Sequence, residues 1–291
     1  MAEAAETWTV LKLINWTKEF FEKARLENPR LCAEMLLAHV LQCPRIGLYT
    51  RFDYQPSPAE LAEFRELVGR ARKFEPVAYL VGEKEFYSRR FKVTPDVLVP
   101  RSETELLVRE AVEHLRPKSG SLTAWDVCTG SGCVGIALAT QVKDLAVLAT
   151  DISPKAVEVA TENAQSNQVA GRVRCRVSDL LTVPEDCRDL APFEVITGNP
   201  PYISVNQMIS ETVKHEPSIA LWGGKDGMDL IGPILAKAPD MLRSGGALIM
   251  EFGYAMADAV RDAAVATGQF REPRILRDHQ EIERAMVALR K

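Results

Sequence analysis

The sequence predicts an α/β domain that follows a small all-α domain. Apolar residues recur at three- and four-residue spacing up to about residue 75, and strand-like and helix-like segments alternate from about residue 103 onward. The 291 residues are enough for two domains of ordinary size. We therefore expect a helical domain over residues 1–75, a β-hairpin linker over residues 76–99 and an α/β domain over residues 100–291.

The N-terminal region predicts three amphipathic helices. They cover the segments "WTVLKLINWTKEFFEKA", "PRLCAEMLLAHVLQ" and "SPAELAEFRELVGRARK". Ser57 and Pro58 suit the cap and first turn of the third helix. Because such apolar stripes usually face a core, we expect Leu31, Met35, Leu37 and Leu41 to pack inside the bundle rather than to form a groove for a partner.

Residues 76–99 change in character and predict the linker. Aromatic and β-branched residues surround "YSRR", with Phe86, Phe91 and Val93 as the apolar positions. This pattern is typical of a short β-hairpin.

The C-terminal region alternates strand and helix signals. The predicted strands are "LTAWDVC", "LAVLATD", "GRVRCRVSD", "FEVITGN", "GALIMEFG" and "RAMVALR". Helical segments lie between most of them, and one opens at Ser153 and Pro154 with two agreeing start signals. This alternation indicates βαβ units and a parallel sheet.

Composition narrows the class of protein. The net charge of −4 does not favour binding of a polyanion, so we expect no direct nucleic-acid binding. The chain shows neither a long apolar run nor a secretory signal, which favours a cytoplasmic protein without membrane contact. The six cysteines form no C-x-x-C pair and do not cluster with histidines, so no metal site is expected.

A glycine-rich turn, "DVCTGSGCVG", follows the first strand of the α/β region. Glycines there let the backbone approach a ligand closely, and the following helix presents unpaired N–H groups. Gly130, Gly132 and Gly135 fit G-x-G-x-x-G, a spacing that also serves dinucleotides. The turn predicts a nucleotide-like cofactor without choosing its class.

Acidic residues end the next two strands. Asp151 is placed to accept two hydrogen bonds from a ribose diol, although it could instead only lead into the helix capped at Ser153. Asp179 could reach an adenine amino group while Leu180 covers the ring. For Asp179 an ordinary loop carboxylate is an equally good interpretation.

The segment "NPPY" follows the fourth strand, on the sheet edge that carries the glycine turn. Pro200 and Pro201 fix the backbone and remove two N–H donors, which leaves carbonyl oxygens as acceptors. Asn199 adds a side-chain carbonyl and Tyr202 a ring face. Such a site suits a planar –NH2 group, and both amides and nucleobase amines qualify.

Together, "NPPY" and the D-x-x-x-G-x-G turn resemble the amino-group methyltransferases that use S-adenosylmethionine. Within them, "EPVAYLVGEKEFYSRRFKVTPDVLVPRSETELLV", "NPPYIS", "EPSIALWGGKDGMDL" and "EFGY" resemble the HemK/PrmC family of peptide chain release factor glutamine methyltransferases. The resemblance covers nearly the whole chain. It implies a Rossmann-like, seven-stranded class I methyltransferase domain that methylates the glutamine of the Gly-Gly-Gln loop in class 1 release factors.

The resemblance also implies roles for individual residues. The residues expected around S-adenosylmethionine are Asp126, Cys128, Thr129, Gly130, Ser131, Gly132, Asp151, Leu180 and Asn199, of which Asp126 supports the loop. Asn199, Pro200 and Tyr202 would hold the substrate amide, with Pro201 in the same motif. Two positions depart from the family, which commonly has glycine in place of Cys128 and proline in place of Ser102.

Four alternatives remain open. A sister enzyme that methylates a glutamine of a ribosomal protein would share the cofactor site, and a nucleic-acid amino methyltransferase would share "NPPY" but should carry a basic groove. A nicotinamide-dependent oxidoreductase would share the glycine spacing and leave "NPPY" unexplained. The last alternative is a binding module without enzymatic activity.

Overall fold

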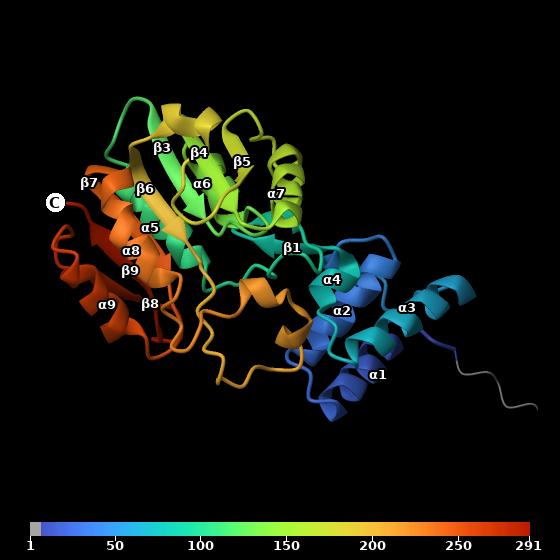
Figure 1. Cartoon of the computed structure of the whole chain (residues 1–291). Coiled ribbons are helices and arrows are strands. Elements are labelled where there is room, and N and C mark those ends of the chain that lie inside the picture. Colours follow the sequence, from blue (N-terminus) through green and yellow to red (C-terminus); the bar gives the residue numbers. More distant parts are fainter. Residues whose placement is uncertain (1–6) are drawn as a thin grey trace, which may run out of the picture. The chain divides into compact units, whose positions relative to one another are not determined.

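The computed structural model describes residues 7–291, which form two compact units (Figure 1). One unit ends at Gly82 and also includes Ser210–His215, and the other consists of Glu83–Ile209 and Glu216–Lys291. The boundary at Gly82 divides the segment that the sequence assigns to a linker. No helix among residues 7–291 is long and apolar enough to span a membrane.

The unit that ends at Gly82 is helical. Its helices are α1 (Val10–Lys23), η1 (Arg45–Thr50), α2 (Pro29–Val40), α3 (Pro58–Ala71), α4 (Val77–Val81) and η3 (Val213–His215). The three predicted helices are confirmed, and Ser57 and Glu60 form a capping box at the start of α3. Leu37 is buried as expected, but the prediction for Leu31 is wrong because its side chain lies on the outer face of α2 and is 39% exposed.

The larger unit contains a seven-stranded sheet in the order β5-β4-β3-β6-β7-β9-β8. The strands are β3 (Leu122–Val127), β4 (Leu145–Asp151), β5 (Val173–Val177), β6 (Phe193–Gly198), β7 (Leu242–Glu251), β8 (Arg274–Arg277) and β9 (Glu283–Leu289). Neighbours pair in parallel except at β9, which is antiparallel to β7 and β8. The predicted α/β fold is confirmed. The edge strand β8 is absent from the strands that the residue pattern predicts.

Helices cover both faces of this sheet (Figure 1). One face packs against α5 (Glu105–Leu115), α6 (Cys133–Gln141) and α7 (Pro154–Ser166), and the other packs against α8 (Ile231–Met241) and α9 (Ala257–Ala266). Adjacent strand residues divide between the two cores: Ala124 joins the first and Trp125 the second. This two-sided burial explains why the central parallel strands β3 and β4 are mostly apolar in sequence.

A hairpin of β1 (Glu83–Phe86) and β2 (Arg89–Lys92) precedes the sheet. Phe86 and Phe91 are buried with their rings edge to face at 6.0 Å between centroids. The backbone N–H of Lys92 donates to Asn163 Oδ1 of α7 at 2.7 Å. The hairpin is therefore anchored to the α/β unit.

The strand order places a topological switch point at β3 and β6. From β3 the chain runs outward to β4 and β5, and then returns to the other side of β3 as β6. Loops after β3 and β6 therefore diverge and leave a crevice at the carboxyl ends of the strands, where α/β folds bind ligands.

Candidate functional site

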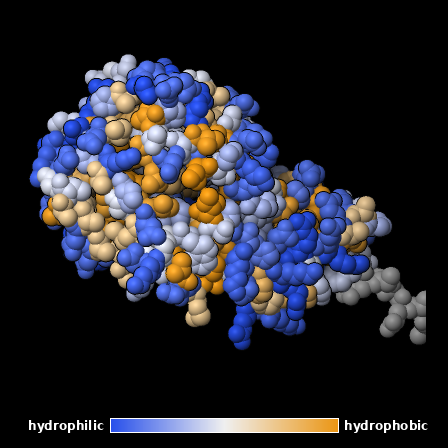
Figure 2. Space-filling model, in the orientation of Figure 1, coloured by the Kyte–Doolittle hydropathy of each residue, from blue (hydrophilic) through white to orange (hydrophobic). Residues whose placement is uncertain are grey.

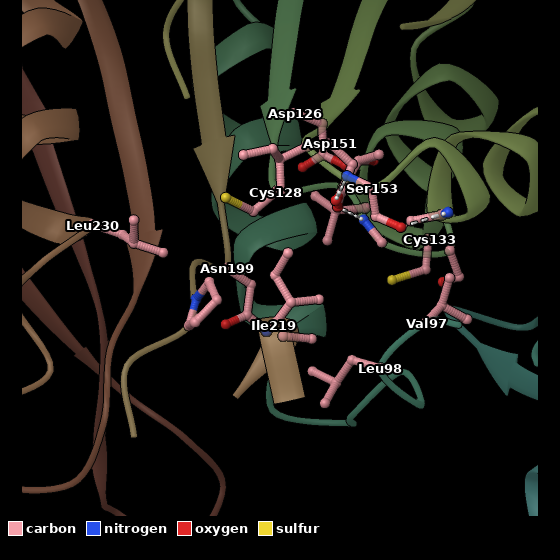
Figure 3. Close-up of a pocket in the computed structure, with 18 of the residues that line it drawn as sticks. Val97, Leu98, Asp126, Cys128, Cys133, Asp151, Ser153, Asn199, Ile219 and Leu230 are labelled. Atoms are coloured by element: carbon pink, nitrogen blue, oxygen red, sulfur yellow. Dashed lines mark hydrogen bonds between the residues drawn. The ribbon is translucent and has the colours of Figure 1, made fainter. Parts of the chain in front are cut away.

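A cavity of about 450 Å³ lies at this carboxyl edge. The loops after β3, β4, β5 and β6 line it, together with residues 96–104 and two further segments, Ser218–Trp222 and Asp229–Leu230. Figure 2 shows a hollow at this place on the surface, bordered by hydrophobic residues, and Figure 3 shows side chains from these loops converging on the cavity. Its volume is in the range of small-molecule sites.

Asp126, at the end of β3, holds the glycine turn from within. Its Oδ2 accepts hydrogen bonds from Thr129 Oγ1 at 2.5 Å and from the N–H of Gly135 at 3.1 Å, and its Oδ1 accepts one from Thr197 Oγ1 at 2.8 Å. Burial raises the pKa of Asp126 from 3.8 to about 6, and the three hydrogen bonds oppose that rise. That Asp126 supports the cofactor loop stays a prediction, and these three hydrogen bonds are the physical basis for it.

Glycine is required in the turn itself. Gly130 and Gly132 adopt left-handed backbone conformations, with φ of +54° and +81°. A β-carbon at Gly130 would meet no atom within 4 Å, so this side of the backbone is open, whereas one at Gly132 would lie 2.8 Å from Ile136. Cys128 is also left-handed, with φ of +56°, which explains why glycine suits that position.

Asp151 ends β4 beside the turn. Its Oδ2 accepts from the N–H of Gly130 at 2.9 Å and its Oδ1 from the N–H of Ser153 at 3.0 Å. Each carboxylate oxygen keeps a further lone pair, so a diol could still be bound. Burial raises the pKa of Asp151, and the backbone N–H groups counteract this. Ser153 caps α7 through the N–H of Ala156, so Asp151 both lines the cavity and leads into a capped helix.

Asp179 and Leu180, after β5, also line the cavity. Leu180 is partly buried against the core that includes Trp125, while Asp179 is exposed. The two residues therefore differ in their surroundings: the Leu180 side chain packs against the core, and the Asp179 carboxylate is exposed to solvent.

Strand register brings Asn199 to the centre of the edge. Val127 pairs with Gly198 and Gly198 pairs with Met250, so the residues that follow these three, Cys128, Asn199 and Glu251, lie in a row. Asn199 and Cys128 line the cavity (Figure 3). Burial raises the pKa of the Cys128 thiol, which stays protonated.

Glu251 and Thr104 lie behind Asn199. Asn199 Nδ2 donates to Thr104 Oγ1 at 3.2 Å, Thr104 Oγ1 donates to Glu251 Oε2 at 2.7 Å, and the Tyr202 hydroxyl donates to Glu251 Oε1 at 3.0 Å. Burial raises the pKa of Glu251, and the hydroxyl donors oppose the rise. These side chains form one hydrogen-bonded network.

Residues 216–223 form another wall of the cavity, and they contact both residues 99–101 and the loop after β6. Glu216 is buried, accepts from the N–H of Val99 at 3.0 Å and pairs with Arg101. Ile203 forms an isolated parallel bridge with Trp222. A β-carbon at Gly223 would lie 2.5 Å from the carbonyl oxygen of Pro201, so the two segments meet backbone to backbone.

The structure brings most of the predicted site residues to one cavity. Those that line it are Asp126, Cys128, Thr129, Gly130, Ser131, Asp151, Asp179, Leu180, Asn199 and Pro201. Gly132 caps α6 instead, Pro200 is buried, and the ring of Tyr202 packs beside Gly253. The roles predicted for Pro200 and Tyr202 therefore depend on a backbone carbonyl and on the network rather than on an exposed ring.

Thr104, Glu216 and Glu251 were not singled out from the sequence. Each lies in a segment that carries the family resemblance, but no neighbouring residue marks it as part of a site. Their partners are distant in the chain, so only the fold identifies them.

The cavity fits S-adenosylmethionine. It has the open backbone at Gly130 and the carboxylate of Asp151 on one wall, and the hydroxyl of Ser131 is buried with no partner among the described residues. Within residues 7–291, no group of three or more His, Cys, Asp or Glu side chains could hold a metal ion.

Comparison with known proteins gives a consistent result. Residues 12–82 match the PrmC N-terminal domain and residues 102–217 match the methyltransferase small domain. A release factor glutamine methyltransferase of Rhodopirellula baltica is 40% identical over 98% of each chain, and one of Geobacter sulfurreducens is 38% identical over 92% of each chain.

Among solved structures, the catalytic domain of hMettl16 in complex with the MAT2A 3'UTR hairpin 6 covers 68% of this chain and 74% of its own, with a TM-score of 0.53 and 12% identity. This likeness concerns the fold alone. The full-length similarity to the curated relatives shows that the chain belongs to the family of release factor glutamine methyltransferases.

Proposed function

We propose that this protein transfers a methyl group from S-adenosylmethionine to the side-chain amide nitrogen of the glutamine in the Gly-Gly-Gln loop of class 1 peptide chain release factors. One observation carries the proposal: Asn199 borders the same cavity as the glycine turn and Asp151. An acceptor for an –NH2 group therefore faces a site that fits the methyl donor. The names of the relatives support the release factor as the protein substrate.

Positioning is the main contribution of the protein to this reaction. S-adenosylmethionine, when bound, supplies an electrophilic methyl group. The nitrogen of an amide is a poor nucleophile because its lone pair is delocalised into the carbonyl. Asn199 Oδ1 and the carbonyl of Pro200 accept the two N–H groups, direct the lone pair, and stabilise positive charge that develops on nitrogen.

Placement of the substrate nitrogen should contribute more to the rate than the strength of the hydrogen bonds that hold it. In-line placement can remove up to about 7–11 kcal/mol of barrier, whereas a neutral hydrogen bond contributes only about 0.5–1.5 kcal/mol. The proton leaves to water after methyl transfer, so no strong base is needed. Glu251, the carboxylate nearest to Asn199 in the strand register, already accepts two hydroxyl hydrogen bonds.

Asp151 and the turn hold the donor in this scheme. Asp151 would accept hydrogen bonds from the ribose hydroxyls, the backbone at Gly130 and Ser131 would lie close to the cofactor, and Leu180 and Asp179 would hold the adenine. The protein acts in the cytoplasm on a protein substrate, and its net charge of −4 supports the expectation that it does not bind nucleic acid directly.

Mass spectrometry tests the proposal. The protein is incubated with S-adenosylmethionine and, separately, with a class 1 release factor, a large-subunit ribosomal protein and an adenine-containing oligonucleotide. We expect one added methyl group on the Gly-Gly-Gln glutamine, and none on a release factor in which asparagine replaces that glutamine. Methylation of only the ribosomal protein or the oligonucleotide would overturn the choice of substrate.

A further inference from the structure

Glu251 is a buried carboxylate for which the reaction has no direct use. It ends β7 with only 2% of its surface exposed, and the register of β6 and β7 places it next to Asn199. Within the described part of the chain, it forms no ion pair; its oxygens are engaged by the hydroxyls of Thr104 and Tyr202. A buried acidic group is costly unless its hydrogen bonds are satisfied, so this arrangement needs a reason.

The direction of the hydrogen bonds follows from donor and acceptor chemistry. A hydroxyl has one proton, and Thr104 gives it to Glu251 Oε2 at 2.7 Å. The Thr104 oxygen can then only accept, so the Asn199 amide must present Nδ2 to it, at 3.2 Å. This direction holds for the ionised carboxylate and for an acid protonated on Oε1.

The consequence falls on the other atom of the amide. With Nδ2 engaged by Thr104, Asn199 Oδ1 is directed elsewhere, and no group of residues 7–291 donates a hydrogen bond to it. An amide that turned over would place a donor where a substrate –NH2 group needs an acceptor. The network selects one of two orientations that differ little in shape.

We infer that Thr104 and Glu251 are positioning residues, which fix the Asn199 amide so that its Oδ1 accepts an N–H of the substrate. Tyr202 belongs to the same hydrogen-bonded network, because its hydroxyl donates to Glu251 Oε1 and leaves Glu251 Oε2 to Thr104. The inference deepens the proposed function and rests on it.

The test compares two substitutions at Thr104 with a matched control. Thr104→Val keeps the shape and removes the hydroxyl, whereas Thr104→Ser keeps the hydroxyl. Thr123 is the control because it is also a buried threonine that donates to a buried glutamate, Glu194 Oε2 at 2.9 Å. It lies at the start of β3, whereas the cavity lies at the end of that strand. Each variant is assayed for kcat and KM with a release factor, for affinity of S-adenosylmethionine by calorimetry, and for thermal stability.

We expect Thr104→Val to lower kcat about tenfold or more with unchanged cofactor affinity. Thr104→Ser should stay within about threefold of the wild type, and Thr123→Val should keep the wild-type kcat even where its melting temperature falls. Equal kcat values for Thr104→Val and Thr104→Ser would overturn the inference. So would a loss that appears only in cofactor affinity.

A second variant keeps the test decisive if Thr104→Val does not fold. In Glu251→Gln, the new amide can donate to Thr104, which frees the threonine proton for Asn199 Oδ1 and lets that amide turn over. We expect kcat to fall about tenfold or more, and a wild-type kcat would overturn the inference. A wild-type enzyme that methylates no glutamine is a separate outcome, which removes the proposed function and this inference with it.

Discussion

Asp126 lies next to the last residue of β3 and Glu251 is the last residue of β7, at the same sheet edge, and both are buried carboxylates held by threonine hydroxyls. They differ in what they hold. Asp126 accepts from Thr129 and from the N–H of Gly135, both within nine residues, and also from Thr197 of β6, so it holds its own loop and ties that loop to one neighbouring strand. Glu251 accepts from Thr104, 147 residues earlier in the chain, and through it reaches Asn199.

This difference reflects how the two halves of the cavity are built. In the proposed scheme, the half of the cavity that binds the cofactor is built mainly from a local turn, in which backbone N–H groups and glycines set the geometry. The half proposed to bind the substrate is assembled from distant segments through side-chain hydroxyls. We therefore expect changes in the first half to alter cofactor affinity and stability, and changes in the second half to alter kcat.

The largest expected effect tests the substrate half. Asn199→Ala removes the acceptor for the substrate amide and should lower kcat about 100-fold or more, with cofactor affinity retained in calorimetry. Asn167→Ala is the control, since that amide bonds to Arg90 and Asn163 at the end of α7, away from the cavity. If weaker cofactor binding were the only defect of Asn199→Ala, the division between the halves would fail.

The next effect tests the cofactor half. Asp151→Ala removes a carboxylate that accepts hydrogen bonds, and hydrogen bonds to charged groups contribute about 1.5–3 kcal/mol. The KM for S-adenosylmethionine should therefore rise about 10- to 100-fold, with little change in kcat at saturation. Asp144→Ala, an exposed residue before the other end of β4, should leave both constants unchanged. An unchanged KM for Asp151→Ala would remove that residue from the site.

A pH dependence follows from Asp126. Its pKa is about 6 in the fold against 3.8 ordinarily, so the folded state binds the proton more tightly. Stability from this group is greatest at low pH and is lost as the pH rises from about 4 to about 6, by up to about 3 kcal/mol. Asp126→Asn cannot titrate, so urea unfolding of this variant should lack that part of the wild-type slope. Parallel curves for the two proteins would contradict the buried state of Asp126.

The smallest effect concerns Cys128. A β-carbon at its φ of +56° is strained, so Cys128→Gly should be more stable to urea than Cys128→Ala by about 0.5–1 kcal/mol. Both variants lack the thiol, which isolates the effect of the backbone. Equal stability, or a more stable alanine variant, would show that the turn adapts to a side chain.

Much of the fold could be predicted because its signals are local. Ser57 and Glu60 cap α3 within four residues, and strands β3, β4 and β6 are buried along nearly their whole length. The edge strand β8 spans only Arg274–Arg277, is largely exposed and has charged ends, so it lacks an apolar run. Leu31 was misassigned because the apolar stripe of α2 is wider than the face that is buried.

The same contrast holds at the site. The position of the glycine turn and of Asp151 at one cavity could be predicted, since a glycine turn after a strand and an acidic residue at the end of the next strand are local signals. Thr104 and Glu251 could not, because a threonine before a helix and a glutamate after a strand have many ordinary uses. Their pairing depends on the β6–β7 register and on where α5 begins, and both are properties of the folded chain.

Gly223 has a consequence for saturation mutagenesis. Any side chain there would collide with the backbone of Pro201 and Tyr202, at 2.5 and 2.7 Å from its β-carbon. A screen that measures only activity would find Gly223 as intolerant to substitution as a catalytic residue, although glycine has no side chain to offer a ligand. Intolerance at Gly223 would measure how closely two backbones approach, and a map of essential positions therefore needs a parallel measure of abundance to separate chemistry from fit.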